Sequence, residues 1–161
     1  MIKQELPLQE GNAAPDFCLP TGGGGEVTLS DQLGSPVIVY FYPKDNTPGC
    51  TTEALDFSAL AHEFSELGAR IIGISPDSVK KHDNFIAKHD LSILLAADVE
   101  KSVCETYGVW VEKKMYGKTY MGVERSTFLI DQNGKLARIW PKVKVKGHAT
   151  EVLEATRTIT K

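Results

Sequence analysis

Short unbroken apolar runs alternate along the chain with longer amphipathic stretches. The apolar runs are rich in β-branched and aromatic residues, as expected for strands buried on both faces of a sheet. The amphipathic stretches place apolar residues three or four positions apart, which is typical of helices that cover a sheet. The expected strands are Pro36–Tyr42, Ala69–Ser75, Ser92–Ala96, Arg125–Asp131 and Lys135–Trp140, and the expected helices are Thr51–Leu67, Ser78–His89, a segment capped by Asp98 and running to Tyr107, and His148–Ile159.

Glycine-rich and polar segments separate these elements. The run Gly22–Gly25 lies between two short apolar segments, Phe17–Pro20 and Glu26–Leu29. Because no Lys-Ser or Lys-Thr pair and no helix follows the glycines, they predict a hairpin tip rather than a phosphate-binding loop. Gln132–Gly134 has the composition of a tight hairpin turn, and Gly108–Gly122 is expected to form a lysine-rich loop or hairpin.

The order of these elements predicts an α/β, thioredoxin-like fold. Strands that alternate with helices, followed by a closing hairpin and a last helix, favour a central mixed sheet flanked by helices, with an N-terminal β-hairpin. The 161 residues are 42% hydrophobic, which suffices for one core. We therefore expect residues 1–161 to form a single domain.

Composition and charge narrow the classes of function. The net charge of −3 gives no reason to expect a nucleic-acid partner. No apolar stretch approaches the ~20 residues of a membrane-spanning helix, and Met1–Gly11 lacks the features of a signal peptide. The three widely spaced cysteines argue against a secreted disulfide framework and predict a reducing, cytoplasmic location. The four histidines do not pair with cysteines at metal-ligand spacing, so we expect no metal site and no cofactor.

Cys50 is the strongest candidate for a reactive group. The strand Pro36–Tyr42 is followed by a proline- and glycine-containing turn, Pro43–Gly49, and then by Cys50 at the start of the helix Thr51–Leu67. Unpaired backbone N–H groups and the helix dipole favour an anion at that position. A thiol is a useful nucleophile only as a thiolate, so this placement predicts an activated cysteine.

The helix terminus alone is too weak to ionise a thiol. An ordinary cysteine is only a few per cent thiolate at pH 7, and making it mostly thiolate requires about 3 to 4 kcal/mol. The dipole contributes about 0.3 to 1 kcal/mol, whereas a cation ~4 Å away contributes about 4 kcal/mol at an effective dielectric constant of ~20. Arg125, at the entrance of an apolar strand, is the best candidate for that cation, because strand ends beside a strand-to-helix turn are where α/β sheets build sites.

Several ordered motifs resemble those of the peroxiredoxins, in the form typical of the bacterioferritin comigratory protein or peroxiredoxin Q branch. The segment from Phe41 to Ala54 resembles the active-site signature Pro-x-x-x-Thr-x-x-Cys, and the similarity extends from about Gly11 to the C-terminus. The other similar segments are Ala14–Phe17, Gly73–Asp77, Lys113–Lys118 and Gly122–Asp131. This resemblance implies a thiol peroxidase that reduces hydrogen peroxide and organic hydroperoxides.

The resemblance also implies the roles of four residues. Cys50 would be the peroxidatic thiolate that becomes sulfenic acid. Thr47 would hydrogen-bond the substrate and the thiolate through its hydroxyl, Pro43 would shield the thiolate without adding an N–H donor, and Arg125 would stabilise the thiolate and the departing oxygen. From its spacing, one turn into the helix, we expect Glu53 to orient Arg125.

The sequence departs from this branch in the step that follows oxidation. Many members carry a resolving cysteine five residues after the peroxidatic one, where this chain has Leu55, and others carry it on the next helix, Ser78–His89, which here has no cysteine. We expect a one-cysteine mechanism in a monomer, with glutathione, glutaredoxin or thioredoxin as the external reductant. A disulfide from Cys50 to Cys104 or Cys18 is the alternative, and it would require local unwinding around Cys50.

Other classes of function compete with this interpretation. A thiol–disulfide oxidoreductase would carry Cys-x-x-Cys, but Thr47 occupies the position of its first cysteine. A non-enzymatic redox sensor or chaperone could use the same oxidation of Cys50, and turnover with excess reductant would separate it from a peroxidase. Residue types alone leave a cysteine hydrolase open, although no histidine is marked out as the base of Cys50.

Overall fold

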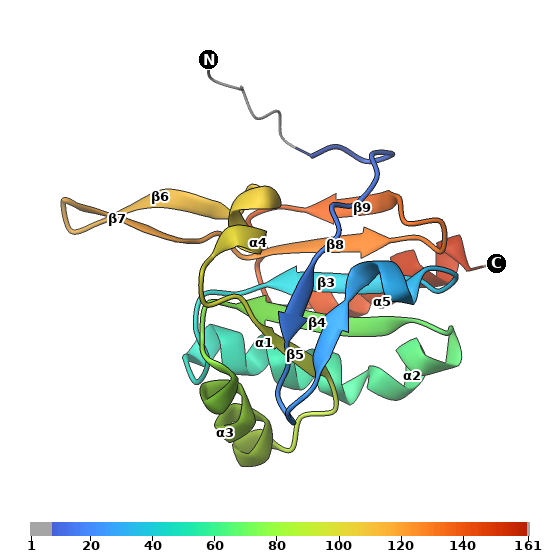
Figure 1. Cartoon of the computed structure of the whole chain (residues 1–161), viewed down its shortest axis with the longest axis horizontal. Helices are drawn as coiled ribbons and strands as arrows, with labels where there is room; N and C mark the ends of the chain where they lie inside the picture. Colours follow the sequence, from blue (N-terminus) through green and yellow to red (C-terminus); the bar gives the residue numbers. More distant parts are fainter. Residues whose placement is uncertain (1–7, 161) are drawn as a thin grey trace.

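A five-stranded mixed sheet forms the centre of the computed structural model, which describes residues 8–160 (Figure 1). Every residue of two of its strands, Val37–Phe41 and Ser126–Ile130, is buried, which explains why the sequences of these strands are mainly apolar. The strands lie in the order β5-β4-β3-β8-β9. β3 (Val37–Phe41), β4 (Arg70–Ser75) and β5 (Leu94–Ala97) pair in parallel, and β8 (Ser126–Ile130) pairs antiparallel with both β3 and β9 (Leu136–Trp140).

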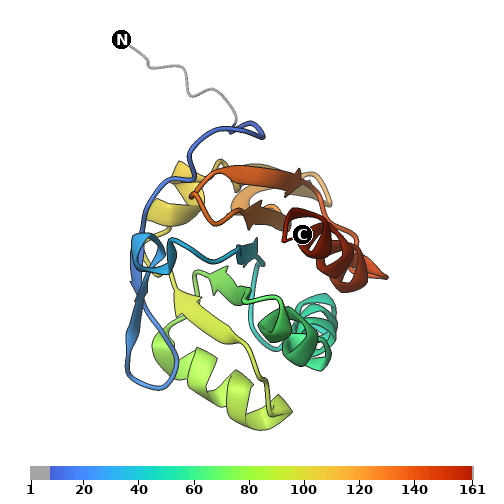
Figure 2. The ribbon, with the colours of Figure 1, turned by 90° about the vertical axis from the view of Figure 1, so that its right-hand side faces the viewer.

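Alternate residues of β3 belong to two separate cores on opposite faces of the sheet. Val37, Val39 and Phe41 belong to one cluster, and Ile38 and Tyr40 belong to the other. Figure 2 shows the elements that lie on either side of the sheet. The face that carries Ile38 is here called the helical face, and it packs against α1 (Pro48–Ala59), α2 (Ala61–Glu66), α3 (Val79–His89) and α5 (His148–Ile159). The opposite face is here called the hairpin face, and it packs against β1 (Cys18–Pro20), β2 (Glu26–Thr28) and α4 (Ser102–Thr106).

Two further elements complete the described part of the chain. The 3₁₀ helix η1 (Leu29–Gln32) follows the N-terminal hairpin. The antiparallel pair β6 (Trp110–Met115) and β7 (Lys118–Val123) projects beyond the sheet (Figure 1). The predicted mixed sheet, its flanking helices and the N-terminal β-hairpin are therefore confirmed, and the segment predicted as a loop or hairpin is a hairpin.

Two predicted helices were wrong in their extent. The stretch predicted as one helix, Thr51–Leu67, is divided at Leu60, whose N–H turns back to the carbonyls of Phe57 and Ser58, so that α1 ends and α2 begins. The helix predicted to follow Asp98 begins only at Ser102, after a left-handed residue. Asp98 still accepts hydrogen bonds from N–H groups of the first turn of α4, as its prediction as a cap implied.

The register of the sheet brings Cys50 and Arg125 to the same end of the central strands, where β3 ends and β8 begins. Phe41, the last residue of β3, lies opposite Ser126, the first residue of β8. Arg125 therefore lies just beyond the end of β3, where the turn toward Cys50 begins. Phe41 also pairs with Ile74 of β4, so the segment after β4 reaches the same edge.

The sequence predicted neither a signal peptide nor a membrane-spanning helix. The expected lack of a signal peptide concerns Met1–Gly11, of which residues 1–7 lie outside the described residues. Within residues 8–160, no helix has the length and apolar character needed to cross a membrane.

Candidate active site

Cys50 lies in the first turn of α1, as predicted. Thr47 is the N-terminal cap residue, with an extended backbone, and α1 begins at Pro48, so Cys50 is its third residue. Pro48 suits this start because its missing N–H belongs to the first turn, where N–H groups have no helical partner. The Cys50 side chain is only 2% exposed. A negative charge on its sulfur would therefore face the helix dipole with little screening by water.

The guanidinium of Arg125 joins Cys50 to Glu53. Nη2 of Arg125 donates to Sγ of Cys50 at 3.3 Å, and Nη1 donates to Oε1 of Glu53 at 2.6 Å. Gly49 makes room for this contact, because a Cβ at that position would lie 3.2 Å from Nη2. The predicted orientation of Arg125 by Glu53 is therefore present in the structure.

Burial sets the electrostatics of this ion pair. The Glu53 side chain is 1% exposed, and burial raises the pKa of Glu53 to about 7 although the charge of Arg125 opposes the shift. Burial would lower the pKa of Arg125, but the negative charges of Glu53 and Cys50 outweigh it and raise the value. The guanidinium thus stays charged, and a cation at this distance can stabilise a thiolate by about 4 kcal/mol at an effective dielectric constant of ~20.

Thr47 and Pro43 lie on the turn between β3 and α1. The Thr47 hydroxyl donates to the carbonyl oxygen of Lys44 at 2.8 Å, so among the described residues its hydrogen bond stays within the turn rather than reaching Cys50. Pro43 is half-buried directly after Tyr42. With its one proton committed to Lys44, the Thr47 hydroxyl can only accept a hydrogen bond from a bound molecule.

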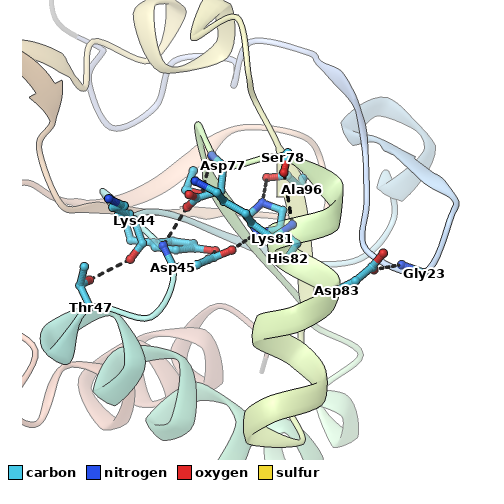
Figure 3. Close-up of polar contacts among 12 residues, drawn as sticks. Gly23, Lys44, Asp45, Thr47, Asp77, Ser78, Lys81, His82, Asp83 and Ala96 are labelled. Atoms are coloured by element: carbon cyan, nitrogen blue, oxygen red, sulfur yellow. Dashed lines mark hydrogen bonds and ion pairs between the residues drawn. The ribbon is translucent and has the colours of Figure 1, made fainter.

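A buried polar network that the sequence reasoning missed holds the other side of this turn (Figure 3). Atoms of Asp45, Asp77 and His82 lie within 4.8 Å of one another, and all three residues are buried. Hydrogen bonds within the network already engage these atoms, as they do in a structural cluster. One signal could have found it: His82 lies three and four residues before Phe85 and Ile86, on the buried face of α3.

The other two cysteines are far from Cys50 in the architecture. Cys104 is fully buried in the core of the hairpin face, whereas Cys50 belongs to the core of the helical face. Burial, and after it the charge of Asp98, raises the pKa of the Cys104 thiol, which keeps it protonated. Cys18 is exposed on β1, between two residues that pack against the hairpin face. Leu55, five residues after Cys50 on α1, is 41% exposed.

Comparison with known proteins gives consistent similarities. Residues 11–139 match the model of the AhpC/TSA family. The chain is 51% identical to Peroxiredoxin Bcp of Bacillus subtilis over 152 residues, which cover 94% of this chain and 97% of the relative. It is similar to the solved structure of Xanthomonas campestris Peroxiredoxin Q, with a TM-score of 0.86 and 49% identity over 90% of this chain and 92% of that one.

A second solved structure gives a link to chemistry. It is a trapped-intermediate and ligand complex of Xanthomonas campestris bacterioferritin comigratory protein, described for alkyl peroxide reduction. Its TM-score is 0.86 and its identity is 48%, over 90% of this chain and 92% of that chain. These likenesses confirm the predicted thioredoxin-like peroxiredoxin fold.

Replacing Arg125 tests its charge on the sulfur. In Arg125→Ala we expect the fraction of Cys50 that is thiolate at neutral pH to fall at least about tenfold, because the cation that contacts Sγ is lost. The ultraviolet absorbance of the thiolate measures this fraction. Arg157→Ala, which removes a partly exposed arginine of α5, is the matched control and should leave it unchanged. An unchanged thiolate fraction in Arg125→Ala would show that another group supplies the charge.

The raised pKa of Glu53 makes stability depend on pH in a defined direction. Glu53 binds its proton more tightly in the folded state, so its contribution to stability is full below pH 4.5 and is lost as pH rises through about 7. The free energy of unfolding of the native chain, relative to Glu53→Gln, should therefore fall by up to about 3 kcal/mol over that range. Urea unfolding across this pH range measures it, with Glu26→Gln on the exposed face of β2 as the control. A difference that stays flat with pH would contradict the buried carboxyl.

Proposed function

Because this chain belongs to the AhpC/TSA family, as a peroxiredoxin of the Bcp or peroxiredoxin Q type, we propose that Cys50 is its peroxidatic cysteine and that an external thiol completes each cycle. The chain is a thiol peroxidase, and its substrates are a peroxide and a thiol reductant. The observation that carries the proposal is the contact of Arg125 with the sulfur of Cys50 at the start of α1.

The cycle balances with one cysteine. The Cys50 thiolate attacks the terminal oxygen of the hydroperoxide, the S–O bond forms, and the O–O bond breaks. The departing alkoxide or hydroxide takes up a proton, and Cys50 becomes sulfenic acid. Two molecules of an external thiol then supply two electrons, giving back the Cys50 thiol, one water and one disulfide.

Each site residue has a proposed part in the first step. Arg125 stabilises the thiolate and the negative charge that grows on the departing oxygen, and Glu53 keeps the guanidinium in place. Thr47 accepts the hydrogen bond of the hydroperoxide proton, because its own proton is engaged by Lys44. Pro43 shields the sulfur and adds no competing N–H group.

The position of the other cysteines supports resolution by an external thiol. A disulfide requires Cα atoms about 4.4 to 6.8 Å apart. Cys50 and Cys104 belong to cores on opposite faces of the sheet, so the sheet lies between them. Cys18 is on the hairpin that covers the hairpin face, so it too lies across the sheet from the helical core.

The proposal extends to substrate, reductant, assembly and location. The organic hydroperoxides proposed as substrates, beside hydrogen peroxide, rest on the alkyl peroxide reduction of the Xanthomonas campestris relative. The external reductant is thioredoxin, glutaredoxin or glutathione. One chain supplies Cys50, Thr47 and Arg125, which supports a functional monomer. Three free thiols support a cytoplasmic location.

Cys50→Ser tests the proposed nucleophile. This variant should consume no peroxide with excess thiol, because a serine hydroxyl does not ionise at neutral pH and forms no sulfenic acid. Peroxide loss over many equivalents per chain is the measurement, and the native chain should exceed one equivalent many times over. Retained turnover in Cys50→Ser would remove the proposal.

A double replacement tests external resolution. Cys18→Ser together with Cys104→Ala should turn over within about twofold of the native rate with a small thiol, because neither sulfur takes part. Alanine is used at 104 because the site is fully buried, and thermal unfolding shows whether the variant is folded. A folded double variant without turnover would favour an internal partner.

A further inference from the structure

The ring of His82 is enclosed by hydrogen-bond acceptors. It is fully buried; Nδ1 lies 2.7 Å from Oδ2 of Asp45, and Nε2 lies 3.0 Å from the carbonyl oxygen of Ala96 (Figure 3). A carbonyl oxygen can only accept, so Nε2 donates to Ala96, and Nδ1 shares a hydrogen bond with the carboxyl group of Asp45. The other oxygen of Asp45 accepts from the Tyr42 hydroxyl at 2.6 Å. Asp45 is thus held from two sides.

The same network fixes the peptide between Lys44 and Asp45. The N–H of Asp45 donates to Oδ2 of Asp77 at 2.8 Å, and that oxygen also accepts from the Ser75 hydroxyl at 2.7 Å. The carbonyl of the same peptide, on Lys44, accepts the hydroxyl of Thr47 at 2.8 Å. Because a peptide unit is planar and stiff, fixing its N–H also fixes the direction of its carbonyl.

The helix that carries His82 is itself anchored. The Ser78 hydroxyl accepts from the N–H of Lys81 and caps the start of α3. Oδ1 of Asp83 accepts from the N–H of Gly23 at 2.7 Å, which ties α3 to the tip of the N-terminal hairpin. Figure 3 shows His82 on this helix facing the turn that carries Asp45 and Thr47. His82 therefore contacts the turn from a fixed support.

We infer that His82 is a positioning residue for peroxide, which acts through Asp45 and the Lys44–Asp45 peptide to set the hydroxyl of Thr47. The inference rests on the proposed roles of Cys50 and Thr47. His82 touches neither the sulfur nor Arg125, so its effect is confined to the side of the site that receives the hydroperoxide. Arg125, held by Glu53, sets the charge of the sulfur independently of it.

Two reactions of Cys50 separate these effects. Peroxide uses Thr47 and the thiolate, whereas alkylation by iodoacetamide uses the thiolate alone. In His82→Gln, which removes the ring and its contact with Asp45, we expect the single-turnover rate of Cys50 oxidation by hydrogen peroxide to fall roughly 10- to 100-fold, as for a misplaced catalytic group. The alkylation rate should stay within about twofold. The control His62→Gln, at an 81% exposed side chain of α2, should change neither rate.

Two further measurements cover a variant that fails to fold. Tyr42→Phe removes one hydrogen bond to Asp45 and keeps the buried charges, and it should slow the peroxide reaction severalfold without changing alkylation. Nitrogen NMR of the unmodified chain should show a proton on Nε2 of His82, the nitrogen that faces the carbonyl oxygen of Ala96. The full chain is used throughout.

Three outcomes would overturn the inference: a native peroxide rate in folded His82→Gln, an equal fall of both rates, which is the result of general loosening, or a His82 ring without a proton on Nε2. Each of these leaves the role of Cys50 intact, because Cys50→Ser tests that role separately. If Cys50 were not the peroxidatic residue, the variant Cys50→Ser would still consume peroxide.

Discussion

The structure of the site depends on one partly buried cation, Arg125, shared by two acidic groups. Arg125 contacts Sγ of Cys50 with one nitrogen and Oε1 of Glu53 with the other. A buried carboxylate without a partner would cost several kcal/mol, so Glu53 and Arg125 hold each other in place. Nη2 of the guanidinium then points at the sulfur of Cys50. Every other feature of the site, from the start of α1 to the register of β8, serves to bring these three groups together.

The sheet separates the thiol of Cys50 from those of Cys104 and Cys18. Alternation along β3 creates two cores, and the chain places Cys50 in one and Cys104 in the other. In the proposed function an external thiol needs only access to the turn before α1, whereas a disulfide within the chain would have to join cysteines from opposite sides of the sheet. The network of Asp45 and His82, fully within the helical side, also ties that turn to α3. The same packing that stabilises the fold therefore favours an external reductant.

Much of this could be predicted from local sequence. The apolar run before Pro43 predicted β3, the turn placed Cys50 at a helix start, and an arginine at a strand entrance predicted the cation, because each signal lies within one element. The division of the predicted helix at Leu60 could not be predicted, since it depends on a few backbone hydrogen bonds of that turn. Asp45 and His82 are 37 residues apart, and only the parallel strands bring them together. The sequence gives no sign of which groups surround a lone buried histidine, so the contacts of His82 are visible only in the structure.

The most direct test is the mass of the reduced protein after one equivalent of hydrogen peroxide, without reductant and with a sulfenate trap added afterwards. The account predicts a gain of one oxygen atom, captured by the trap at Cys50. A loss of two hydrogens, with Cys50 joined to Cys18 or Cys104 in the peptide map, would contradict it and establish a two-cysteine cycle within the chain.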